Sequence, residues 1–319
     1  MGFEPMKELL LYTLSKRAPS TTRPPLQNYI IECLLYIKLI ITLILMKIYD
    51  CFTYCGENDL LEIRLETLFD SIDKFIIIEG NKYFNGENKE KFFKPKQFEK
   101  FKDKISYFFI ENFPKHNGNN WDYELFQRNQ ISKGLKNLSA NDIVLVSDVD
   151  EIPNLNNKEF LKFDSTVFLQ KMYYYKFNLQ YKKGLKWNNK WPGTKSCKYK
   201  YFQNAQTTRE FRNKNIPWWR IDKKMNRYIE EDGGWHFTYL MSPEEIRNKL
   251  QKFDHEIIHL LKNNYDKKSL TNLDEIKKRI SNFEDPYGRK DVKLINVEID
   301  KNYPKYILNN INKYKKYIL

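Results

Sequence analysis

The chain has 319 residues, of which 41% are hydrophobic and 16% aromatic, and it carries a formal net charge of +14. This length and apolar content exclude a disordered protein and allow one large α/β core or two modest domains. The positive charge suggests an anionic partner, but lysines occur along many segments instead of forming one basic stripe, which favours solvated helix faces over a nucleic-acid site.

The first 45 residues differ in character from the rest. Segment 29–46, YIIECLLYIKLIITLILM, is mostly apolar but contains Glu32 and Lys38. A spanning helix needs about 20 apolar residues with few charges, so membrane association through this segment is not favoured. We expect an N-terminal extension over 1–45 and one domain over 46–319.

The cysteines give a prediction about location. They show neither zinc-site spacing nor the density of a disulfide framework: Cys33, Cys51, Cys55 and Cys197. Reduced thiols in a cytoplasm-like compartment, or a peripheral location, fit this usage. A membrane protein held by an N-terminal signal anchor is the alternative.

Strand and helix patterns alternate from Lys47 onward. The sequence predicts strands over 47–54, 74–80, 105–112 and 142–150, and helices over 58–72, 95–104 and 121–138. This order predicts an α/β fold with a Rossmann-like, mainly parallel sheet and right-handed crossovers. Ligands of such sheets bind at the carboxyl ends of the strands. No G-x-G-x-x-G follows the first strand and no P-loop motif occurs, which argues against dehydrogenases and P-loop enzymes.

The second half is richer in aromatic residues. Segments 165–181 and 197–204 predict a smaller β region that covers one side of the site. A capping box then starts a helix, with Ser242 as N-cap and Glu245 at the third position. The last 50 residues predict peripheral C-terminal helices.

An acidic cluster ends the strand over 142–150, in the sequence DIVLVSDVDEIP. A solvated turn is the plain explanation of such a cluster. However, Asp148 and Asp150 lie two residues apart, so both side chains are expected on one face, where they repel unless a cation or a raised pKa intervenes. Oxygen ligands facing a diphosphate suit Mg²⁺ or Mn²⁺. The D-x-D arrangement is typical of nucleotide-sugar transferases.

Several segments together resemble glycosyltransferase family 17, the group of β-1,4-mannosyl-glycoprotein N-acetylglucosaminyltransferases. They are MKIYDCFTYCGENDLLEIRLETL, DKFIIIEG, WDYELFQRNQI, LVSDVDEIP and GGWHFTYL followed by IRNKLQKFDH, with YPKYILNNINKY near the end. The resemblance implies a GT-A fold, a UDP-GlcNAc donor, a glycan acceptor such as mannose, a divalent metal and inversion at the anomeric carbon. The chain lacks the long stem of the secretory-pathway enzymes, which leaves the glycoprotein acceptor open.

Metal ligands are expected in two segments. Asp150 is the first candidate, with Asp148 on the ribose or on a metal-bound water. His236, in GGWHF, is the candidate late ligand, as C-terminal histidines are in many GT-A enzymes; a core histidine between two aromatic residues is the alternative.

For the general base we expect Asp232, in the acidic step before His236, with Glu151 as the second candidate. A turn residue before two glycines is the plain reading of Asp232.

The donor is expected to contact further residues. Glu79 ends the second strand, where it can accept from a uracil N–H. Arg128 is expected near the diphosphate, and Gly193 where backbone approaches the donor. The alternatives are that Glu79 is a surface acid, that Arg128 forms a structural ion pair and that Gly193 is an ordinary turn glycine. Tryptophans that could stack on sugars are Trp187, Trp191, Trp218 and Trp219.

Two other classes compete with a transferase. A basic, aromatic-rich nucleic-acid-binding protein would need interleaved cations and rings on one face. A metal-dependent phosphohydrolase would supply more ligands early in the chain than occur before Asp148.

Overall fold

The computed structural model describes residues 33–34, 46–115, 120–182, 190–211, 225–252, 267–289 and 292–319. The chain divides into two compact units, Met1–Met46 and Lys47–Leu319, and the second contains the fold described below. Within the described ranges, no helix has both the length and the apolar character that crossing a membrane requires. Apart from residues 33, 34 and 46, the apolar segment 29–46 lies outside those ranges.

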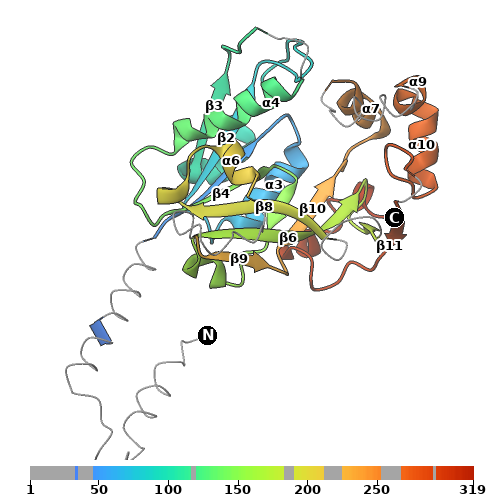
Figure 1. Cartoon of the computed structure of the whole chain (residues 1–319). Helices are drawn as coiled ribbons and strands as arrows, with labels where there is room; N and C mark the ends of the chain where they lie inside the picture. Colours follow the sequence, from blue (N-terminus) through green and yellow to red (C-terminus); the bar gives the residue numbers. More distant parts are fainter. Residues whose placement is uncertain are drawn as a thin grey trace, which may run out of the picture. The chain divides into compact units, whose positions relative to one another are not determined.

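Within the described ranges, eleven strands form one sheet, with the main order β11-β7-β6-β8-β4-β1-β2-β3. Figure 1 shows β4, β8 and β6 side by side in it. β10 pairs with β5 and β6, and β9 pairs with β6. The strand bounds are β1 Ile48–Thr53, β2 Lys74–Gly80, β3 Ile105–Ile110, β4 Ile143–Asp148, β5 Glu151–Pro153, β6 Ser165–Tyr174, β7 Leu179–Tyr181, β8 Lys190–Lys198, β9 Arg227–Glu230, β10 Gly234–Thr238 and β11 Leu294–Asn296.

Helices connect and flank these strands. The α-helices are α3 Asn58–Leu68, α4 Asn120–Asn129, α6 Ala205–Arg209, α7 Pro243–Lys252, α9 Lys267–Thr271, α10 Leu273–Ser281 and α11 Lys305–Asn309. Short 3₁₀ segments are η1 Pro95–Lys104, η2 Gln130–Gly134, η3 Glu159–Lys162, η4 Tyr199–Tyr201 and η6 Lys315–Tyr317.

The sheet is mixed, so the prediction of a mainly parallel sheet was wrong. β4, β1, β2 and β3 are parallel neighbours, as the alternating first half predicted. Beyond β4 the sheet turns antiparallel through β8, β6, β7 and β11. The physical reason is the connection. A parallel pair needs a long crossover, whereas short links such as 175–178 between β6 and β7 return the chain antiparallel.

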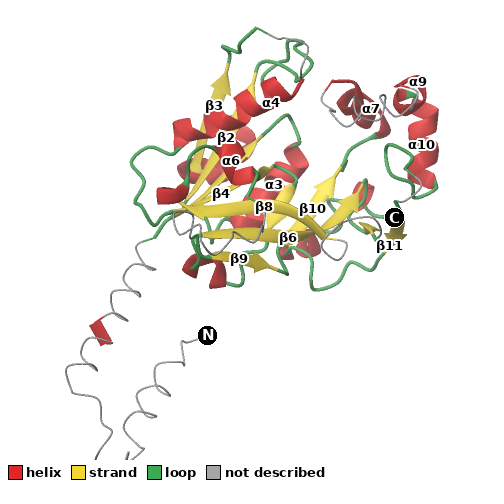
Figure 2. Cartoon of the chain, in the orientation of Figure 1, coloured by secondary structure: helices red, strands yellow, loops and turns green. Residues whose placement is uncertain are grey.

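The inner parallel strands β4, β1 and β2 are mostly buried on both faces, as crossover helices require. In β2, residues 75–80 are all buried. The strand order sends the chain outward from β1 to β3 and back to β4, so right-handed crossovers place α3 and η1 on one face and α4 on the other. Figure 2 shows α3 and α4 beside the strands. The site discussed below lies where β4 ends.

The C-terminal segment packs on α3, contrary to the expected peripheral tail. Tyr306 Oη donates to Glu62 Oε1 at 2.7 Å, and Tyr317 Oη donates to Asp59 Oδ2 at 2.7 Å. Tyr314 between them is buried. Residues near the end of this chain therefore pack on α3.

Candidate active site

β4 ends in a tight acidic turn that returns as β5. Asp148 closes β4, and Glu151 begins β5, which pairs antiparallel with β10 so that Glu151 lies opposite His236. Because the strand ends at Asp148, the two-residue alternation does not continue to Asp150. The two aspartates have different ion-pair partners, and their joint action on one cation stays a prediction.

Asp148 faces two arginines. Its Oδ2 lies 2.9 Å from Arg209 Nη2, and its Oδ1 lies 3.4 Å from Arg128 Nη2. Burial alone would raise the pKa of Asp148, but the charges of Arg209 and Arg128 hold it well below its usual value. Asp148 is therefore ionised throughout the neutral range.

Glu151 is almost fully enclosed by donors. Its carboxylate forms a two-pronged ion pair with Arg209 and accepts from Trp191 Nε1 at 2.6 Å. It also accepts the backbone N–H of Asp148 at 3.0 Å. These bonds tie β5 and β8 to the turn and fix the Glu151 side chain.

Asp150 pairs with His236. His236 Nε2 lies 3.5 Å from Asp150 Oδ2, and both side chains are about nine-tenths buried, with exposures of 10% and 11%. Burial would lower the pKa of His236, but the neighbouring Asp150 charge raises it overall. The other ring nitrogen, Nδ1, is buried and has no hydrogen-bond partner among the described residues.

This pair fits a divalent cation only as part of a ligand set. It offers one carboxylate and one imidazole, and the partnerless Nδ1 leaves a ring nitrogen uncommitted. Over the described ranges, no three His, Cys, Asp or Glu side chains converge as metal ligands. Water and diphosphate oxygens would have to complete the coordination, as is usual for Mg²⁺.

Arg128 and Gly193 both lie beside the acidic turn. Arg128 pairs with Glu124 as well as reaching Asp148. The carbonyl of Gly193 accepts from Arg209 Nη1 at 3.2 Å. A Cβ at Gly193 would lie 1.9 Å from Gln170 Oε1, so a larger residue here would have to displace the Gln170 side chain.

Glu79 has a different set of partners. It is fully buried and accepts from Lys89 Nζ at 2.9 Å and from Tyr107 Oη at 2.8 Å. The backbone N–H groups of Phe92 and Phe93 also donate to it, at 2.7 and 3.0 Å. Its carboxylate anchors the loop after β2, and contact with a uracil ring stays a prediction.

Asp232 is exposed and lies four residues before His236, in the turn between β9 and β10. Its Oδ2 accepts from Asn154 Nδ2 at 2.9 Å. Gly234, which has a φ of 112°, begins β10, the strand that carries His236. The role of Asp232 as the general base stays a prediction.

One of the four candidate tryptophans lies beside the acidic turn. The ring centre of Trp191 is 5.5 Å from that of His236, whereas Trp187, Trp218 and Trp219 lie outside the described residues.

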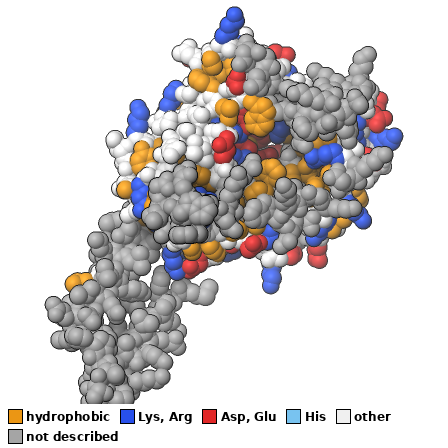
Figure 3. All heavy atoms as spheres, viewed as in Figure 1, with side chains coloured by type: hydrophobic (Ala, Val, Ile, Leu, Met, Phe, Trp, Pro, Cys, Tyr) orange, Lys and Arg blue, Asp and Glu red, His pale blue; other side chains and the backbone are white. Residues whose placement is uncertain are grey.

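On the face shown in Figure 3, Lys and Arg side chains are scattered and form no single stripe.

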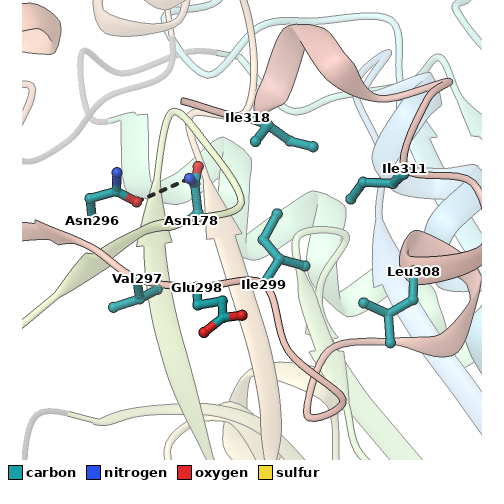
Figure 4. Close-up of a pocket in the computed structure, with 8 residues that line it drawn as sticks. All are labelled: Asn178, Asn296, Val297, Glu298, Ile299, Leu308, Ile311 and Ile318. Carbon is teal, nitrogen blue, oxygen red and sulfur yellow. Dashed lines mark hydrogen bonds between the residues drawn. The ribbon is translucent and has the colours of Figure 1, made fainter.

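A separate hollow of about 710 Å³ lies at the C-terminal segment. Figure 4 shows its lining: Asn178, Asn296, Val297, Glu298, Ile299, Leu308, Ile311 and Ile318. No predicted site residue is among them.

The sequence reasoning missed Arg209 and Arg64. Arg209 lies about 60 residues from its partners on a short helix with no recognisable pattern, so no local signal marks it. A local signal did mark Arg64. It follows Leu60 by four residues and Leu61 by three, so it lies on the apolar face of α3, and it is fully buried. A buried arginine requires an anionic partner, and Asp50 on β1 is that partner.

Comparisons with known proteins identify a family and several relatives of this chain. Residues 41–319 match the sequence profile of glycosyltransferase family 17. The chain is 31% identical over 117 residues to the human beta-1,4-mannosyl-glycoprotein 4-beta-N-acetylglucosaminyltransferase and equally to the rat protein. The mouse protein is 30% identical.

These similarities cover part of each protein. The matched region is 33% of this chain and 22% of the human protein. No solved structure matches the chain significantly. Because the family profile covers nearly all of the described domain, the chain belongs to glycosyltransferase family 17.

Proposed function

We propose that this enzyme transfers GlcNAc from UDP-GlcNAc to a hydroxyl of a glycan, with mannose as the acceptor sugar, by an inverting and metal-dependent reaction in a GT-A fold. The single observation that carries the proposal is the Asp150–His236 pair beside Asp148, at the carboxyl end of β4. Strand ends of this kind are where ligands of open α/β sheets bind. The donor and acceptor follow the names of the matched relatives.

Each residue of the cluster has a proposed role. Asp150 and His236 would hold Mn²⁺ or Mg²⁺, which would neutralise charge on the leaving diphosphate. Arg209 and Arg128 hold Asp148 ionised and oriented, and Asp148 is proposed to face the donor ribose or a metal-bound water. Glu79, Arg128 and Gly193 remain the proposed donor contacts.

The test is a fluorescence titration with UDP, with and without Mn²⁺. Trp191 donates to Glu151 and lies beside His236, so its emission should report on the cluster. We expect UDP to bind far more tightly with Mn²⁺, and a Trp191→Phe variant to lose most of the signal. Equal UDP binding in both conditions would argue against metal dependence.

Asp150→Asn is the matching variant. It preserves shape but removes the anionic ligand, so Mn²⁺-dependent UDP binding and transfer should be lost while thermal unfolding changes little. Asp103→Asn, the same change at an exposed position on η1, serves as the control. Wild-type Mn²⁺ dependence in Asp150→Asn would show that the metal ligand is misassigned.

A further inference from the structure

Arg64 is a fully buried arginine whose charge is matched within the protein. Its Nε donates to Asp50 Oδ2 at 2.7 Å and its Nη2 to Asp50 Oδ1 at 2.5 Å, and both side chains have 0% exposure. The paired arrangement is the geometry in which a guanidinium binds a carboxylate most specifically. α3 and β1 are thereby joined inside the core.

The remaining donors of Arg64 converge on the acidic turn. Nη1 donates to the carbonyl oxygens of Asp148 at 3.0 Å, Val149 at 3.3 Å and Glu151 at 2.8 Å. Nη2 donates to Ser147 Oγ at 2.5 Å. One side chain thus contacts four of the five residues from 147 to 151.

These contacts fix peptide planes, and peptide planes set where the side chains of the turn point. Within four residues the turn sends Asp148 to Arg209, Asp150 to His236 and Glu151 to Trp191. Such divergence needs carbonyl groups that point inward, and buried carbonyl groups need donors. Arg64 donates to all three carbonyls, and that of Glu151 also accepts from Thr194 Oγ1 at 2.9 Å.

We propose that Arg64, held by Asp50, is a positioning residue of the active site: it orients the acidic turn so that Asp150 and Asp148 can bind cation and donor. The proposal rests on the function proposed above. Arg64 does not contact the reactants. Its effect on transfer would pass through the turn, because a displacement of about 1 Å can lower a rate by about 10².

Lysine is the informative substitution. Arg64→Lys keeps the charge opposite Asp50, but a single ammonium with three donors cannot replace a planar group with five. Arg279 on α10 provides the matched control. It is buried and donates to the carbonyl oxygens of Leu270, Pro286 and Ser269, away from the turn. Arg279→Lys therefore removes a similar set of bonds elsewhere.

The experiment compares the full-length wild type, Arg64→Lys and Arg279→Lys below their unfolding temperatures. Both variants should unfold at lower temperature. Only Arg64→Lys should show faster amide hydrogen exchange over 147–152, at least about 10-fold weaker Mn²⁺-dependent UDP binding, and a fall in kcat of roughly 10². If Arg64→Lys does not fold, Ser147→Ala, which removes one Arg64 contact, should show the same exchange change to a smaller extent.

The outcomes separate the two proposals. If Arg64→Lys and Arg279→Lys show the same amide hydrogen exchange over 147–152 and the same kcat, the positioning role of Arg64 is overturned. A wild type without transfer or Mn²⁺-dependent UDP binding would instead overturn the proposed function. In that case the exchange comparison still decides whether Arg64 orders the turn, and unchanged exchange over 147–152 counts against it.

Discussion

Glu151 and Asp232 are the two carboxylates predicted to deprotonate the acceptor, and their surroundings differ. Glu151 lies in the cluster but is held by Arg209 and Trp191, whereas Asp232 is exposed and bonded to Asn154. A base has to reach the acceptor hydroxyl at hydrogen-bond distance. The placement beside Asp148 and His236 favours Glu151.

We therefore expect Glu151→Gln to reduce transfer by about 10² to 10⁴, the usual contribution of a positioned base, and Asp232→Asn to reduce it much less. Kinetics at saturating UDP-GlcNAc with a mannose-containing acceptor measure this. UDP-GlcNAc binding to both variants is the control, since a base acts on the acceptor. The opposite ranking would return the role to Asp232.

Single residues were predictable where the signal is local. The capping box at Ser242 and Glu245 is confirmed, because Ser242 N donates to Glu245 Oε2 at 2.7 Å and Glu245 N donates to Ser242 Oγ at 3.2 Å. The four cysteines are free, as expected. Arg209 could not be found, because its pairing with Asp148 depends on how β8 and α6 bring distant segments together.

At the scale of elements, periodicity located most strands and helices of the first half but not their ends. The helix expected over 121–138 is α4 only to Asn129, followed by the 3₁₀ segment η2. At Gly134 the chain passes so close to β2 that a Cβ would lie 2.5 Å from Ile76 Cγ2. The helix predicted over 95–104 is the kinked 3₁₀ segment η1. In the segment 121–138, tertiary packing against β2 therefore overrode helix propensity.

The contact between α3 and the C-terminal segment should depend on pH. Burial would raise the pKa of Glu62, but hydrogen bonds from Lys313 and Tyr306 lower it overall. A carboxyl with a lowered folded pKa stabilises the fold above its unfolded pKa, near 4.3, and loses that contribution as pH falls through the folded value.

Glu62→Gln should therefore lower the free energy of unfolding by about 0.5–1 kcal/mol at pH 7, and by progressively less below about pH 4. Denaturant unfolding at several pH values measures the difference. Glu99→Gln removes an exposed pair with Lys102 and is the control. A deficit that persists at pH 2 would mean that the loss is one of packing and not of charge.

For the whole molecule, the alternating pattern predicted the parallel half and the edge of the sheet at which the cluster lies. The antiparallel half was not predictable in the same way, because some of its strands pair with strands far away in the sequence. β4 and β8, for example, are antiparallel neighbours although more than 40 residues separate them.

A chain shortened to residues 46–319 should fold and transfer sugar. The unit Lys47–Leu319 contains the whole described sheet and the acidic turn. Thermal unfolding and transfer by the full and shortened chains provide the comparison. Aggregation of the shortened chain, or activity only in detergent, would show that residues 1–45 serve the enzyme as a membrane or packing element.

The packing of the C-terminal segment on α3 has a consequence for biogenesis. Tyr317 and Asp59 are 258 residues apart, so the helix that carries Arg64 is translated long before its cover exists. Contacts of such separation form late because a long loop must close first. On the ribosome, the nascent N-terminal half should therefore stay incompletely folded and depend on chaperones. A premature stop codon that removes only the residues after Tyr314 would leave α3 without this contact, so the truncated product would be prone to degradation.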